Sequence, residues 1–155
     1  MKKITKEILS KVSEVKVSYH PKMKLSEMEL VRCSRDSARI LRQHWDAGSI
    51  HLIEEFKIML LNRAGRVKGI HLVSRGGING TVVDPRIVLL TALGGLAESI
   101  ILSHNHPSGR VAPSNADIEV TKKIKKAASY LDLKVLDHII LGPEEYLSFG
   151  DEGLL

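Results

Sequence analysis

Cysteine is almost absent from this 155-residue chain, and its scarcity excludes several kinds of site. The single cysteine, Cys33, cannot close an intramolecular disulfide, and it has no second cysteine with which to build a thiolate-rich metal site. This usage fits a reducing compartment, so we expect a cytoplasmic protein. Cys33 has no identifiable base partner, and we expect a buried or indifferent thiol rather than a nucleophile.

Long apolar runs are also missing. No stretch approaches the roughly 18 apolar residues of a membrane span, so a membrane is not an expected partner. Aromatic residues make up only 4% of the chain, which leaves little of the aromatic and basic pattern typical of single-strand nucleic-acid faces. The formal net charge of +5 is a moderate excess, which alone says little about phosphate-bearing partners.

The remaining composition is that of one globular domain, since 43% of the residues are hydrophobic and the length suffices for a single core. Periodicity predicts a short helix over residues 4–13 and a strand over residues 14–20. A helix is expected from Ser34 to about Gly48, with Trp45 on its apolar face.

Strands and helices are mixed in the rest of the chain. The predicted elements are a hairpin (54–61 and 67–74), a helix (84–97), a strand (99–103), a helix from residue 114 and a strand (133–141). Because they follow no strict βαβ rhythm, we expect an α+β or α/β sandwich around one curved, mixed sheet.

Two histidines and one aspartate carry the clearest chemical signal. His104 and His106 lie two residues apart at the end of a predicted strand, so both imidazoles can point to one side. A loop rich in proline, serine and glycine can fold back and bring Asp117, in the first turn of the next helix, to face them. Three protein ligands leave one tetrahedral position for water, the pattern of a catalytic zinc site.

A hydrolytic zinc site also needs a proton acceptor and an oxyanion donor. Glu54 and Glu55 precede an apolar strand, and either of them could lie over the metal without binding it. Ser114 begins the helix that carries Asp117, where it can act as an N-cap, and its hydroxyl or amide could also hydrogen-bond an oxyanion. We therefore expect metal-assisted amide hydrolysis.

These residues carry a specific resemblance. The pattern H-x-H-x7-S-x2-D from His104 to Asp117, with an upstream glutamate, is similar to the JAMM motif of MPN-type metalloproteases. The run HNHPSG, together with DHII beginning at Asp137 and SF at Ser148, resembles more narrowly the RadC family, whose members are often labelled DNA-repair proteins. The resemblance covers about residues 34–155, which leaves residues 1–33 as an N-terminal strand and helix extension that we expect to pack on the domain.

The resemblance implies a cytidine deaminase-like sandwich with one zinc ion held by His104, His106 and Asp117. It selects Glu54 as the base, with Glu55 as the alternative, and it assigns transition-state support to Ser114. The implied activity is cleavage of an amide or isopeptide bond in a peptide or protein substrate. The alternatives are a DNA-binding accessory module and a nuclease using the same metal; the oligomeric state stays open.

Two further patterns have simpler interpretations. Asp137 and His138 could suggest a second metal or a triad, but adjacent residues on a strand point to opposite faces. We favour structural hydrogen bonding or a contact with the metal site. The lysine-rich run over residues 122–126 is interpreted as the solvated face of a helix, although it could also contact nucleic acid.

Overall fold

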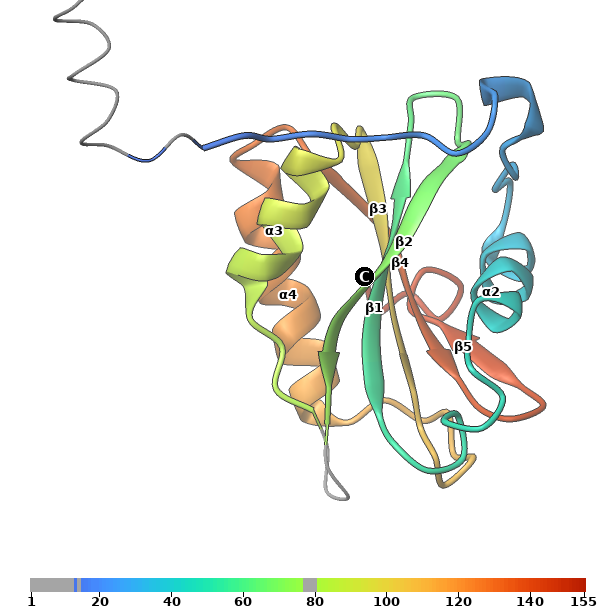
Figure 1. Cartoon of the computed structure of the whole chain (residues 1–155). Helices are drawn as coiled ribbons and strands as arrows, with labels where there is room; N and C mark the ends of the chain where they lie inside the picture. Colours follow the sequence, from blue (N-terminus) through green and yellow to red (C-terminus); the bar gives the residue numbers. More distant parts are fainter. Residues whose placement is uncertain (1–12, 14, 77–80) are drawn as a thin grey trace, which may run out of the picture.

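The fold is a three-layer sandwich built around one mixed sheet. The computed structural model describes residue 13, residues 15–76 and residues 81–155. Helix α2 covers one face of the sheet, and helices α3 and α4 cover the other (Figure 1). The elements are η1 (Leu25–Glu27), α2 (Ser34–Gln43), β1 (Glu55–Leu61), β2 (Val67–Arg75), α3 (Pro85–Gly94), β3 (Ser99–Asn105), α4 (Asn115–Ser129), β4 (Lys134–Leu141) and β5 (Tyr146–Ser148).

The strand order is β2-β1-β3-β4-β5, and only the β3–β4 pair is parallel. Parallel neighbours need a crossover connection, and α4 provides it between β3 and β4. The expected α+β sandwich around a mixed sheet is therefore confirmed.

The hairpin of β1 and β2 forms where turn chemistry predicts it. Asn62 accepts hydrogen bonds through its side chain from the amides of Ala64 (2.9 Å) and Arg66 (3.0 Å). Gly65 has φ of 74°, a left-handed conformation that glycine adopts without steric cost. The two strands then pair antiparallel, as expected.

Strand β1 is buried on both faces, which explains its unbroken apolar run. Phe56, Ile58 and Leu60 belong to the core cluster beneath α3 and α4. Met59 and Leu61 belong to the second cluster, beneath α2. Each fully buried side chain of this size contributes about 1.5–3 kcal/mol relative to exposure, so these side chains stabilise the pairing of the central strands with both helical layers.

Several expected boundaries are wrong. Helix α2 ends at Gln43 rather than near Gly48, because the chain turns at Asp46, whose side chain accepts from the Gly48 amide (2.9 Å). Trp45 is buried from this turn, so its apolar spacing did not require a longer helix. Helix α3 ends at Gly94, three residues before the expected end.

The predicted strand near the N-terminus is also wrong over its described residues. Residues 15–20 are extended but pair with no strand of the described sheet, and Val15 and Val17 are 88% and 69% exposed. Tyr19 fastens this segment by donating to the Lys68 carbonyl (2.9 Å). The predicted helix over residues 4–13 lies outside the described residues, apart from residue 13.

Cys33 is exposed, so of the two expected alternatives, a buried or an indifferent thiol, the buried one is wrong. None of the helices in the described part is long and apolar enough to cross a membrane.

Candidate metal centre

Two histidines that are two residues apart and an aspartate eleven residues further along the chain converge at one end of the sheet. The Nε2 atoms of His104 and His106 lie 2.9 Å apart. Asp117 Oδ1 lies 3.2 Å from His104 Nε2, and Asp117 Oδ2 lies 3.8 Å from His106 Nε2. The three residues therefore form a cluster that could hold a metal ion.

Strand β3 and the residue after it present both histidines to the same side. His104 pairs with Phe56 across β1 and β3, and their rings stack at 6.1 Å. His106 follows the strand, yet its amide still donates to the Leu141 carbonyl of β4 (3.0 Å). The period of two thus continues past the end of β3, so His104 and His106 share a face.

The connection to α4 returns the chain towards the histidines. Gly109 donates its amide to the His106 carbonyl (2.9 Å) and has φ of 83°, which favours glycine in this tight turn. Helix α4 then begins beside the site, and its first turn carries Asp117.

Ser114 caps α4 and also fixes the orientation of Asp117. The Ser114 hydroxyl accepts from the Asp117 amide (3.2 Å) and donates to Asp117 Oδ2 (2.7 Å). The Ser114 amide donates to the same oxygen (2.7 Å). The expected N-cap is confirmed as a reciprocal capping box, and both donors of Ser114 are bound to the carboxylate of Asp117.

The proton positions favour a free Nε2 on His106. Its Nδ1 lies 2.6 Å from the Arg110 carbonyl oxygen, which can only accept a hydrogen bond. Neutral His106 therefore carries its proton on Nδ1 and directs the Nε2 lone pair at the cluster, as a metal ligand must.

Electrostatics keep the carboxylate charged. Burial alone raises the pKa of Asp117, but hydrogen bonding and charge from His104, with the hydrogen bonds from Ser114, hold that pKa well below its ordinary value. The buried ring of His138 contacts the ring of His104. Burial, together with the charge of His104, holds the pKa of His138 well below its ordinary value. The site thus pairs an anionic ligand with a neutral histidine behind it.

The dimensions of the cluster fit zinc. Two ligand nitrogens about 2.0–2.1 Å from a tetrahedral zinc lie about 3.3–3.4 Å from each other. The two nitrogens are 2.9 Å apart, and carboxylate oxygens of Asp117 lie 3.2 Å and 3.8 Å from them, so small side-chain movements suffice for a shared metal ion. The nitrogen and carboxylate donors also match zinc chemistry.

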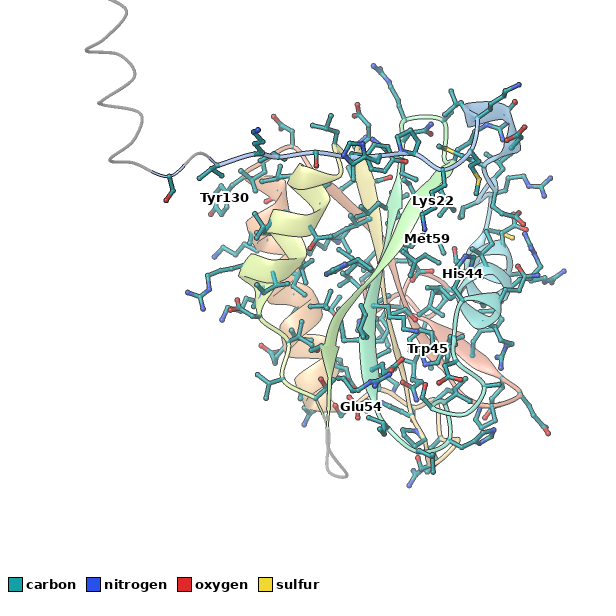
Figure 2. The ribbon with its side chains drawn as sticks, viewed as in Figure 1. Lys22, His44, Trp45, Glu54, Met59 and Tyr130 are labelled. Carbon is teal, nitrogen blue, oxygen red and sulfur yellow. The ribbon has the colours of Figure 1, made fainter. Side chains whose placement is uncertain are left out.

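The two candidate bases lie on opposite faces of the sheet. Glu55 is 1% exposed, and its carboxylate pairs with Arg75 (2.6 Å) and Lys57 (3.1 Å) on the side covered by α2. Phe56 lies beneath α3 and α4, and alternation places Glu54 on that same side. Figure 2 shows Glu54 at the end of the sheet where α4 begins. Alternation therefore directs Glu54 to the side of the cluster, whereas the Glu55 carboxylate lies on the other face.

Asn105 stands between the two histidines and points to the other face. Its Oδ1 accepts from the Glu55 amide (2.8 Å), and its Nδ2 donates to the carbonyls of Ile50 and Ile53 (2.9 Å each). These contacts fasten the backbone on both sides of Glu54. Sequence reasoning assigned no role to this residue, although an asparagine between two histidines at the end of a predicted strand was a usable signal.

Asp137 and His138 do point to opposite faces, and they have different partners. Asp137 accepts from the Ser148 hydroxyl (2.6 Å) and the Gly150 amide (2.9 Å), which ties β4 to the C-terminal turn. His138 contacts His104 instead (Nε2 to Nδ1, 2.8 Å). The favoured interpretation of structural bonding and contact with the site is confirmed.

Comparison with known proteins decides the family. A model of the RadC-like JAB domain matches residues 31–154, which is most of the chain. The chain belongs to the RadC-like JAB domain family. The resemblance to the RadC family stated above is thereby confirmed.

The relatives in this family are longer than the chain. A UPF0758 protein of Porphyromonas gingivalis is 46% identical over 103 residues, covering 66% of this chain and 45% of its own length. A UPF0758 protein of Flavobacterium johnsoniae is 48% identical over 101 residues, covering 65% and 44%. One of Symbiobacterium thermophilum is 35% identical over 147 residues, covering 94% and 63%. The matched segments thus span about half the length of these relatives, whose names state no activity.

Proposed function

We propose that this RadC-like domain is a zinc-dependent hydrolase that cleaves an amide or isopeptide bond in a peptide or protein of the cytoplasm. The observation that carries the proposal is the convergence of His104, His106 and Asp117, whose nitrogen and oxygen atoms face one another at the separations given above. Three protein ligands suit a zinc that keeps one position for solvent.

The proposed ligand atoms are Nε2 of His104, Nε2 of His106 and a carboxylate oxygen of Asp117. A zinc ion held by these atoms would act as a Lewis acid, lowering the pKa of a bound water towards about 7 and polarising a substrate carbonyl. The protein contributes the rigidity of the ligand set, because His104 is buried on β3 and Asp117 is held by Ser114.

Glu54 is the proposed general base. It would take the proton of the attacking water and pass it to the leaving nitrogen, so its carboxylate must be free of other cations. Glu55 fails this requirement, because Arg75 and Lys57 already neutralise it on the far face of the sheet. Two features support this choice: Glu54 is partly buried at the end of the sheet seen in Figure 2, and strand alternation directs it to the face of the proposed ligands.

Ser114 is proposed to support the transition state by donating a hydrogen bond to the oxyanion. Its hydroxyl is bound to Asp117 Oδ2 at 2.7 Å, so this role requires the hydroxyl to rotate away from that oxygen. Orientation of Asp117 is then retained by the Ser114 amide, which donates to the same oxygen.

Metal analysis of the purified protein tests the proposal first. We expect about one zinc per chain in the parent, and loss of zinc in His106→Ala and in Asp117→Ala. Unchanged zinc in both variants would remove the ligand assignment.

Hydrolysis is then assayed with a library of internally quenched peptides, with and without a chelator. Glu54→Gln is expected to keep its zinc and lose turnover, whereas the matched variant Glu55→Gln should keep both, at some cost in stability. Undiminished turnover in Glu54→Gln would show that the base is another group. Cleavage that is insensitive to the chelator would exclude the zinc mechanism.

A further inference from the structure

A row of buried hydrogen bonds runs from the metal cluster into the core. His104 Nδ1 lies 2.8 Å from His138 Nε2 on β4. His138 Nδ1 lies 2.6 Å from Thr121 Oγ1 on α4. The Thr121 hydroxyl lies 2.6 Å from the carbonyl oxygen of Asp117, one turn earlier in the same helix.

Each proton in this row can be placed from chemistry. The carbonyl of Asp117 only accepts, so the Thr121 hydroxyl must donate to it. The Thr121 oxygen is then free only to accept, so His138 carries a proton on Nδ1 and donates it. A neutral His138 consequently has a lone pair on Nε2, which accepts from Nδ1–H of His104.

The surroundings of His138 favour its neutral form. The side chain is 0% exposed, and the rings of Phe56 and Phe149 lie 5.5 Å and 4.6 Å from it. The nearby Asp137 carboxylate is directed at Ser148 and Gly150 rather than at the imidazole. A charged imidazolium buried among aromatic rings would be costly, even with the Asp117 carboxylate nearby.

We propose that Thr121 and His138 are positioning residues that hold His104 in the tautomer with its proton on Nδ1 and its Nε2 lone pair aimed at the metal. The proposal rests on the metal site proposed above. The row closes on Asp117, so the backbone of one ligand residue orients another ligand through two side chains. Outer partners of this kind fix the tautomer and ring orientation of ligand histidines.

The distinguishing experiment pairs Thr121→Val with Thr121→Ser. Valine keeps the shape of threonine and removes the hydroxyl, whereas serine keeps the hydroxyl. We expect Thr121→Val to weaken zinc binding by about 10- to 100-fold, measured by competition with a chromophoric chelator. Thr121→Ser should bind zinc as the parent does. Ile124→Val, a buried change one turn away on α4, controls for a general loss of stability.

A second measurement uses the parent protein alone, so it can be made even if Thr121→Val does not fold. Long-range proton–nitrogen NMR spectra of parent protein labelled with ¹⁵N-histidine, recorded at pH 8, report which ring nitrogen carries the proton. We expect His104 and His138 both to be protonated on Nδ1, with and without zinc.

The outcomes separate this inference from the proposed function. A parent that binds zinc while His138 carries its proton on Nε2 would overturn the positioning role alone, as would a folded Thr121→Val with parental zinc affinity. A parent with the expected protons that takes up no zinc would instead refute the metal site, and with it the purpose of the row.

Discussion

The amide of Asn105 offers a sharp test of how the site is supported. The side chain is 0% exposed and satisfies three backbone groups, namely the Glu55 amide and the carbonyls of Ile50 and Ile53. Asn105→Leu replaces the amide by an apolar side chain of similar volume, so all three backbone groups lose their hydrogen-bond partner at once. The backbone on either side of Glu54 then loses its anchor.

The magnitude follows from these contacts. A buried polar group left without a hydrogen-bond partner costs about 1–3 kcal/mol. The Ile53 carbonyl is only partly buried, so water can take the place of the lost hydrogen bond there and lower the cost. Three groups at the lower end of this range give about 3 kcal/mol of lost stability. For a domain of this length, that loss corresponds to a fall in Tm of about 6–12 °C.

A neighbour on the same strand and face provides the matched control. Ser103 is 0% exposed, and its hydroxyl has no hydrogen-bond partner among the described residues. Ser103→Ala should therefore change stability by less than about 0.5 kcal/mol, or increase it slightly. Both variants are compared by urea and thermal unfolding in chelator. The reasoning is refuted if Asn105→Leu matches the parent, or if Ser103→Ala costs as much as Asn105→Leu.

Three further outcomes are expected. Free zinc at about 100 times its Kd should raise the free energy of unfolding by about 2.7 kcal/mol, and a scan showing no rise in Tm would argue against a specific site. Arg42→Ala removes hydrogen bonds to the carbonyls of residues 142, 143 and 145, so urea unfolding should show a loss of about 1–3 kcal/mol, whereas no loss would contradict the anchoring role. In the folded protein, burial and, to a smaller extent, the charge of His104 lower the pKa of His138 below the value of about 6.5 that it has in the unfolded chain. As the pH falls, the unfolded chain therefore takes up this proton before the folded protein does. The stability of metal-free protein should thus fall as pH drops below about 6.5, by at most about 1.4 kcal/mol per pH unit from this group, and His138→Gln should reduce that slope.

Local chemistry explains which elements could be predicted. The hairpin turn at Asn62 and the caps of α3 and α4 depend on residues within a few positions, so their signals lie in the sequence itself. Residues 15–20 alternate like a strand, but strand formation needs backbone pairing with a neighbouring strand, and these residues pair with no strand of the described sheet. The end of α2 was missed because Trp45 is buried from a turn instead of a helix.

The candidate site divides in the same way. The spacing of the histidines and Asp117 predicts a cluster because the strand end, the glycine turn and the cap are all local features. The row from Thr121 to His104 could not be predicted in this manner, since it joins α4, β4 and β3 through contacts between residues 17 and 34 positions apart.

The alternation of β3 separates metal binding from stability. His104 and His106 face the helix α4 side, while Ser103 and Asn105 face α2, where no ligand is needed. The stretch from Ser103 to His106 therefore supplies two of the three proposed ligands on one face and anchors the backbone around Glu54 on the other. His106→Ala should abolish zinc binding and leave the metal-free fold close to the parent, because His106 is the most exposed of the three side chains and lies outside the core and the α4 cap. Asn105→Leu, by contrast, should destabilise the fold and disturb Glu54 while all three proposed ligands remain. If both kinds of variant lost zinc and stability together, the two faces of β3 would not act independently.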